Sequence, residues 1–252
     1  MKIIAVLLCL FLFCCVCFAE ETDYFDWKGL KSYAAKNYTE SIIYFDMAIK
    51  QDPAYMDAWI HKGDAQKALK DYNASIQTYQ DALKIKGDQA TLWIKMMESY
   101  IAINNYQKAS EIAAKVTDIE PGKKDNWLKA GNLLQMLGRY EEAIGRYDAA
   151  LRLDARYKEA CYQKAISEVA LGKDSEALEL LDRAIYIDPK YKQAYNVRGL
   201  ILEKQGKNED AMASYEKASE IDPKWAPPLI NKEHSLLAQG RISEAMKIFV
   251  TF

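Results

Sequence analysis

The chain has 252 residues, of which 50% are apolar and 28% charged, a composition typical of a globular protein and not of a disordered one. The 34 Lys and Arg residues are balanced by 36 Asp and Glu residues, which argues against nucleic-acid binding through bulk positive charge. Eleven Gly, six Pro and two His disfavour a loop-rich β-sandwich and most histidine-based metal or acid–base sites. Composition therefore points to a helical protein with little catalytic equipment.

The first nineteen residues have the layout of a cleaved secretory signal peptide. Lys2 supplies the positive charge, residues 3–16 are an unbroken apolar run, and Cys17 and Ala19 are the small residues before the cleavage point. A transmembrane helix needs about 20 apolar residues, so the run is short for a span, and an uncleaved anchor is the alternative. We therefore expect a signal peptide over 1–19 and a mature chain over 20–252 that is secreted, periplasmic or at the cell surface. Membrane contact is expected only if the signal stays uncleaved.

From Thr22 to Phe252, similar residues recur every 34 positions without an insertion or deletion. A turn column holds Pro53, Gly87, Pro121, Ala155, Pro189 and Pro223. One large-residue column holds Phe25, Trp59, Trp93, Trp127, Cys161, Tyr195 and Leu229, and a second holds Phe45, Tyr79, Ala113, Tyr147, Leu181, Tyr215 and Phe249. A fixed period of this length indicates a stacked repeat architecture.

Each repeat is predicted to contain two helices, over its positions 1–14 and about 17–28. The turn between them carries Gly138, Gly172, Gly206 and Gly240 in the later repeats, which suits a left-handed helix C-cap. The second helix should end at an Asp-Pro pair, as at Asp188-Pro189, because Pro cannot continue the old helix but is favoured in the first turn of a new one.

These residues resemble the tetratricopeptide repeat (TPR) family, whose pattern is W-x2-L-G-x2-Y, then A-x3-F, A and P. The segments that carry the resemblance are Trp127-x2-Ala130-Gly131 with Ala143-x3-Tyr147 and Ala150, and Tyr195-x2-Arg198-Gly199 with Ala211-x3-Tyr215, Ala218 and Pro223. The repeats fall at 22–55, 56–89, 90–123, 124–157, 158–191, 192–225 and, in part, 226–252. The resemblance implies an all-α, right-handed superhelical solenoid of antiparallel helix pairs, whose first helices line a concave groove.

Motifs for catalysis or cofactor binding are not visible in the sequence. It holds no Gly-rich phosphate loop, no H-E-x-x-H and no paired Cys beyond the signal, so we expect no enzyme activity, metal or cofactor. Cys161 lies in a core column, and His61 and His234 are expected to be polar groove residues. Asn37 and Asn73 begin glycosylation sequons, although helix capping also explains Asn at these turns.

By analogy with the family, groove residues are expected at first-helix positions 2, 5, 9, 12 and 13, with position 6 nearby. The predicted partner-binding residues are Asp57, Ile60, His61, Asp64, Ile94, Lys95, Glu98, Leu128, Lys129, Asn132, Tyr162 and Asn196. Position 2 is acidic in four of six repeats, which indicates either an acidic ledge for a basic ligand or carboxylates that favour the helix dipole.

Position 5 is apolar from Ile60 through Ile94 and Leu128 to Tyr162 and has no Lys, which argues against the family's known grip on a peptide's terminal carboxylate. The apolar run suggests a groove floor for an extended or helical segment, or tighter helix packing.

Both ends of the repeat array carry apolar side chains. The first helix places Trp27, Leu30 and Ala34 in a helical stripe, and the chain closes with Phe249 and Phe252. These residues are expected either to form a head-to-tail interface between copies or to fold back onto the neighbouring repeats.

The sequence therefore predicts a non-enzymatic scaffold that binds a protein or peptide, with no nucleic-acid partner. The alternative is a structural subunit that self-assembles through its ends.

Overall fold

The computed structural model describes residues 21–249, and for Phe249 the backbone only. The predicted signal peptide over 1–19 and Phe252 lie outside the described residues. Residues 21–34 are helical, and they are followed by α2 (Tyr38–Gln51), α3 (Met56–Ala68), α4 (Tyr72–Ile85), α5 (Ala90–Ala102), α6 (Tyr106–Ile119), α7 (Lys124–Met136), α8 (Tyr140–Leu153), α9 (Lys158–Ala170), α10 (Asp174–Ile187), α11 (Lys192–Lys204), α12 (Asn208–Ile221), α13 (Ala226–Ala238) and α14 (Ile242–Phe249). This described range contains no strand, and none of its helices is long and apolar enough to cross a membrane.

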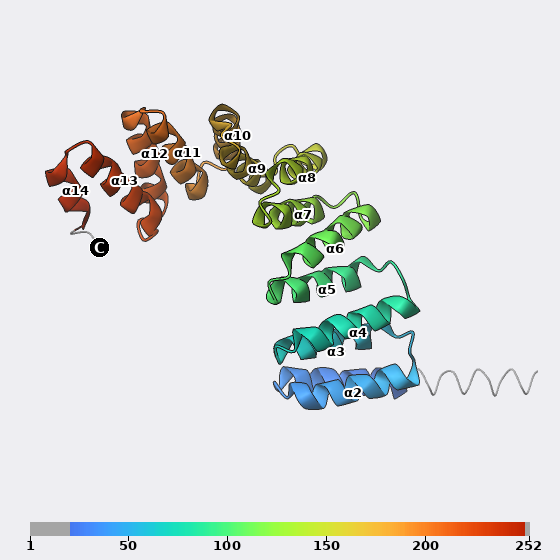
Figure 1. Ribbon diagram of the computed structural model, residues 1–252. Coiled ribbons are helices and arrows are strands. Elements are labelled where there is room, and N and C mark those ends of the chain that lie inside the picture. The colour runs from blue at the N-terminus through green and yellow to red at the C-terminus, as the bar shows by residue number, and fades with distance from the viewer. Residues whose placement is uncertain (1–20, 250–252) are drawn as a thin grey trace, which may run out of the picture. The chain divides into compact units, whose positions relative to one another are not determined.

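The chain divides into two compact units, Met1–Pro121 and Gly122–Phe252. Unit 1 contains the helix over 21–34 and α2 to α6, and unit 2 contains α7 to α14 (Figure 1). Within each unit every helix packs against the next one in the chain, so that helix pairs stack one on another. The predicted two helices per repeat are thus present in every described repeat.

The turns inside each repeat follow the predicted left-handed cap. Gly138, Gly172, Gly206 and Gly240 have φ between 72° and 75°, and in the first three repeats Lys36, Lys70 and Asn104 take the same conformation with φ of 59° to 63°. A side chain at positive φ is strained, so the later repeats, which use Gly, have the better cap.

Two details of the repeat differ from the prediction. The second helices are longer, since α4 fills positions 17–30 of its repeat and not 17–28. Pro189 lies in the turn before α11 and not in the first helical turn, which starts at Lys192. The reason is that Asp188 forms an Asx turn, in which its carboxylate accepts from the Lys190 N–H at 2.9 Å, and the four residues from Asp188 to Tyr191 lie outside both helices.

In the first, second, fourth and sixth repeats, the core of the helix pair depends on a Gly in the first helix against an aromatic ring in the second. A Cβ at Gly63 would lie 2.3 Å from the Tyr79 ring, and one at Gly131 would lie 2.4 Å from the Tyr147 ring. Both rings are fully buried. The ring therefore occupies the volume that a side chain at the Gly would need.

The third and fifth repeats replace both members of this pair. Where the first helix has the larger Met97 the second has Ala113, and where it has Ala165 the second has Leu181. All four side chains are buried. The total volume across the contact is thus kept roughly constant, which is what close packing requires.

Candidate interaction faces

The predicted groove residues lie on one face of the first helices. We call positions 2, 5, 6, 9, 12 and 13 of these helices the first-helix face. In unit 1 it is formed by residues 21–34, α3 and α5, and in unit 2 by α7, α9, α11 and α13. α3 contacts α5, α7 contacts α9 and α11 contacts α13, so equal positions in successive repeats form rows.

The charged residues of the unit 1 face pair with one another. Lys95 donates to Asp64 at 2.7 Å, and Lys67 donates to Glu98 at 2.6 Å. Asp64 also accepts from the buried Tyr79 hydroxyl at 3.0 Å. Each pair joins α3 to α5 or to α4. The structure therefore brings the predicted Asp64, Lys95 and Glu98 together, but as partners of the fold and not as free ligands.

His61 pairs with a buried carboxylate. Its Nδ1 lies 2.8 Å from Oδ1 of Asp26, which is 5% exposed on the first helix. The hydrogen bond to Asp26 raises the pKa of His61, against a smaller opposing effect of burial. The ring also lies 5.5 Å from the Phe45 ring. A cavity of about 90 Å3 opens beside it and is lined by Leu30, Tyr33, Phe45, His61 and Asp64.

The acidic position 2 is partly engaged in hydrogen bonds. Asp125 accepts from the Tyr157 hydroxyl at 2.6 Å. Burial and the nearby carboxylates of Asp26 and Asp23 raise the pKa of Tyr55 to about 12, and Asp23 accepts a hydrogen bond from it. Asp57 is exposed. The acidic ledge and the helix dipole both remain compatible with this geometry.

The predicted face residues of unit 2 are largely used in packing. Asn132 accepts from the Tyr147 hydroxyl at 2.9 Å, and Asn196 accepts from the Asn231 amide at 2.9 Å. Leu128 and Tyr162 are half-buried against core clusters, while Lys129 is exposed. In unit 1, Ile60 and Ile94 are half-buried.

The predicted residues did not include four exposed aliphatic side chains of α7, α11 and α13 on the unit 2 first-helix face. We refer to these four together as the aliphatic row, although Met136 lies two repeats before Leu200. Met136, Leu200, Ile230 and Leu237 are 56%, 44%, 43% and 46% exposed. They lie at positions 13, 9, 5 and 12 of their repeats. Position 9 of unit 2 reads Asn132, Ile166, Leu200 and His234, and position 12 reads Gln135, Val169, Glu203 and Leu237, so neither column marks these residues by a steady change.

The apolar stripe of the first helix is exposed, as a contact surface would be. Trp27 is 56% and Leu30 41% exposed, and Ala34 is exposed as well. The side chain of Phe249 and the whole of Phe252 lie outside the described residues, so the predicted contact between the two ends stays a prediction.

Other residues at these ends were not predicted. Tyr24 is 49% exposed at position 3, where Ala58, Leu92 and Ala160 are fully buried. The Lys28 ammonium lies 4.7 Å from the centre of the Tyr24 ring and 5.3 Å from that of Tyr44. On α14, Ile242 and Met246 are 60% and 64% exposed.

Chemistry elsewhere in residues 21–249 is sparse. Cys161 is buried, and burial raises the pKa of its thiol. The described residues contain no group of three or more His, Cys, Asp or Glu side chains that could hold a metal ion. Asn37 caps α2, where its side chain accepts from the Glu40 N–H, and Asn73 is exposed on α4.

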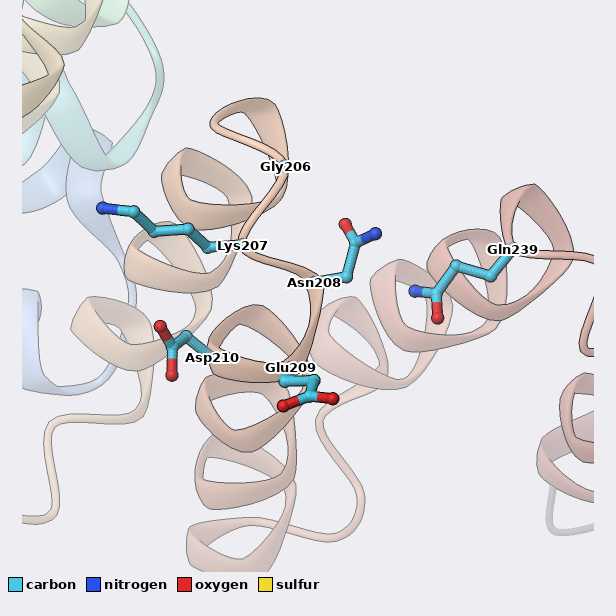
Figure 2. Close-up of a pocket in the computed structure, with 6 residues that line it drawn as sticks. All are labelled: Gly206, Lys207, Asn208, Glu209, Asp210 and Gln239. Atoms are coloured by element: carbon cyan, nitrogen blue, oxygen red, sulfur yellow. The ribbon is translucent and has the colours of Figure 1, made fainter.

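A hollow of about 510 Å3 lies between the start of α12 and the end of α13 and is lined by Gly206, Lys207, Asn208, Glu209, Asp210 and Gln239 (Figure 2). None of the predicted site residues lines this hollow. Gln239 is already bonded to Ser235 at 3.2 Å, and no ring or aliphatic side chain offers an apolar wall.

Comparison with known proteins confirms the repeats. Three family models described as Tetratricopeptide repeat match residues 57–89, 134–201 and 193–224. The first and the last follow the predicted repeats 56–89 and 192–225, and the second begins inside the predicted repeat 124–157. No curated protein matches the chain in sequence.

Solved structures of the same fold cover most of the chain. MamA is 24% identical over 64% of this chain and 95% of its own, with a TM-score of 0.60. YrrB, described as a TPR protein with an unusual peptide-binding site, is 21% identical over 75% of this chain and 97% of its own, with a TM-score of 0.62. A tetratricopeptide repeat protein from Parabacteroides merdae ATCC 43184 is 19% identical over 91% of both chains, with a TM-score of 0.68. At these identities the likeness shows the fold alone, and it confirms the all-α TPR class with about seven repeats.

Proposed function

We propose that this chain of tetratricopeptide repeats is a non-enzymatic scaffold that binds a protein or peptide partner on its first-helix faces, outside the cytoplasm. The observation that carries the proposal is the exposed aliphatic row Met136, Leu200, Ile230 and Leu237 on unit 2. Clustered exposed apolar side chains are typical of protein contact surfaces, and solenoid repeats use such extended faces for binding. YrrB, a protein of the same fold, has a peptide-binding site by its description.

The charges beside the row favour an apolar partner segment over a charged one. Lys204 pairs with Asp174 at 2.7 Å, and Lys232 pairs with Glu216 at 2.6 Å. Because these side chains already neutralise one another, the aliphatic atoms supply most of the available binding free energy. An amphipathic helix or an extended apolar segment fits this chemistry.

The test is site-specific photo-crosslinking in cells of the source. A photoreactive residue at Leu200 or Leu237 is expected to capture a partner. The matched control is Tyr186, which is 83% exposed on α10, a second helix, and therefore presents an even more accessible side chain away from the row. Equal capture from Tyr186, or none from either row position, contradicts the proposal.

Export is tested separately, because the segment over 1–19 carries that part of the proposal. We expect the protein in the extracytoplasmic fraction, with Glu20 as its first residue. An intact chain that begins at Met1 in the cytoplasmic fraction would refute export.

Self-assembly is the second candidate function, and α14 favours it. Met246 is 64% exposed at position 21, where Ile76 and Ser110 are buried. A second copy could cover Ile242 and Met246 with its first helix, in a head-to-tail contact. Light scattering of the wild type and of Ile242→Ser/Met246→Ser tests it: assembly predicts larger particles that the double variant removes, and a monomeric wild type at high concentration rules it out.

A further inference from the structure

The tyrosines of the second helices link the core to the first-helix face. The hydroxyl of Tyr79 donates to Asp64 at 3.0 Å, and that of Tyr215 donates to Glu203 at 2.8 Å. The hydroxyl of Tyr147 donates to the side chain of Asn132 at 2.9 Å and lies 3.3 Å from the side-chain amide oxygen, Oε1, of Gln135. In three repeats, therefore, a phenol oxygen fills the space between the second helix and positions 9 or 12 of the first.

The first repeat breaks this rule. Its second helix has Phe45, which has no hydroxyl, and positions 9 and 12 are Leu30 and Tyr33. The cavity of about 90 Å3 is lined by these three residues, so it lies at the same columns that hydrogen bonds join in the fourth repeat. Three of its walls are therefore apolar or aromatic, and α3 closes it with His61 and Asp64.

The polar wall of the cavity is already satisfied by partners within the fold. Asp64 accepts from Lys95 and Tyr79, and His61 is held by Asp26. A polar ligand would have to break one of these bonds, whereas an aliphatic group would gain contact with Leu30 and Phe45 without such a loss. The cavity has about three times the volume that one water occupies in the liquid, ~30 Å3, which is room for a small aliphatic side chain.

The two helices beside the cavity carry more exposed negative than positive charge near it. Asp57 is exposed one helical turn before His61, and Asp23 is exposed one turn before Trp27. Trp27, 56% exposed, lies between Asp23 and Leu30 on the same helix and extends the apolar surface. Asp23 and Asp57 outnumber the exposed Lys31, whose ammonium lies 5.5 Å from the centre of the Trp27 ring, so this region favours positive charge beside the entering group.

We propose that this cavity, the Leu30 pocket, takes one aliphatic side chain of leucine size from the partner, and that Lys or Arg residues flanking it in the partner pair with Asp23 and Asp57. This inference rests on the proposed function, since it adds the chemistry of one anchor residue to the partner bound on the first-helix faces.

The test uses three capped tripeptides, Lys-Leu-Lys, Lys-Ser-Lys and Glu-Leu-Glu, titrated into the purified protein. Binding is followed by the indole N–H signal of Trp27 in NMR spectra, identified with Trp27→Phe. Lys-Leu-Lys is expected to shift this signal, and Lys-Ser-Lys to bind about tenfold more weakly, because it loses the buried isobutyl group. Glu-Leu-Glu is expected to bind more weakly in wild type than in Asp57→Asn.

The decisive variant is Phe45→Tyr, which adds the hydroxyl that the second, fourth and sixth repeats carry at this position. It should fold, since three repeats accept Tyr here. It should also remove the preference for Leu over Ser, because the hydroxyl takes part of the pocket and puts a polar group against an entering isobutyl group. Leu30→Trp should fill the pocket from the opposite wall. This variant replaces Phe45→Tyr in the binding test if circular dichroism shows that Phe45→Tyr is unfolded.

Equal binding of Lys-Leu-Lys and Lys-Ser-Lys, or a preference for Leu that survives in a folded pocket-filling variant, overturns the inference. Failure here is distinguishable from failure of the proposed function: crosslinking from Leu200 and Leu237 on unit 2 does not involve this pocket and would still capture the partner.

Discussion

The contact between Gly131 and Tyr147 makes a quantitative prediction about the core. Gly131→Ala would place a methyl group 2.4 Å from Cε1 of a fully buried ring that cannot leave its site. Overpacking of this kind costs about 1–3 kcal/mol, and we take the upper end because the ring is enclosed. The higher helix propensity of Ala stabilises the folded state by about 1 kcal/mol relative to Gly, so the net loss in the free energy of unfolding should be about 2 kcal/mol.

The compensating change is already present in the fifth repeat, where Ala165 faces Leu181. Tyr147→Leu alone should cost about 2–3 kcal/mol, because it leaves space in the core. In the double variant the new methyl group enters part of that space, so we expect a total of about 2 kcal/mol in place of the additive 4–5. The coupling free energy is then about 2 kcal/mol or more.

The assay is guanidinium unfolding followed by circular dichroism, with hydrogen exchange of the α7 and α8 amides, because repeat arrays need not unfold in one step. Gly145→Ala on α8 is the matched control. A Cβ there meets nothing within 4 Å, so the same substitution should stabilise the protein by about 1 kcal/mol. Single and double variants that add within about 0.5 kcal/mol would refute the idea that volume is conserved across this contact.

Three further predictions concern unit 1 and the turns. Because the pKa of His61 is raised, its bond to Asp26 stabilises the fold fully below the unfolded pKa of 6.5, and this stability is lost as the pH rises through the folded pKa. The free energy of unfolding, measured between pH 6 and 9, should therefore fall with pH in the wild type and should not show this fall in His61→Gln. Lys70, at φ 63°, should stabilise by about 1 kcal/mol on change to Gly, whereas Gly172→Ala, at φ 75°, should cost a similar amount in the same melting assay. Asp188→Asn, which breaks a 2.6 Å pair with Lys158 but keeps the turn acceptor, should cost less than ~1 kcal/mol and less still in 1 M salt; a larger, salt-independent loss would show that the pair is not a surface interaction.

The period of 34 residues was sufficient to predict the helices, the turns and the core columns. The reason is that a stacked repeat presents the same environment many times, so a residue type needed at one position is written several times in the sequence. Gly138 and Gly172 mark the left-handed turn in this way. The two extra helical residues that end at Ile85 and the Asx turn at Asp188 could not be predicted so directly, because they depend on local hydrogen bonds that many residues would permit.

The candidate site was harder to predict because position on a face does not tell what a side chain contacts. Asp64 and Asn132 lie on the predicted face, but each accepts a hydrogen bond from the hydroxyl of a buried tyrosine on the second helix. Leu200 was not singled out, although it lies in the same column and is 44% exposed. These position 9 residues differ in whether the tyrosine hydroxyl of the same repeat donates a hydrogen bond to them. That is a tertiary contact, and a single column of the repeat does not reveal it.

This dependence explains where recognition can arise in such a scaffold. A position 9 residue that must accept a hydrogen bond from the core is not free to vary with the ligand. In the first repeat Phe45 replaces the tyrosine, and in the sixth the hydroxyl of Tyr215 donates to Glu203. In both repeats position 9 therefore accepts no hydrogen bond from this ring, and the residue there is Leu30 or Leu200. Both of these leucines are more than two-fifths exposed. At position 9 of these two repeats, an exposed leucine thus goes with a core side chain that donates no hydrogen bond to that position.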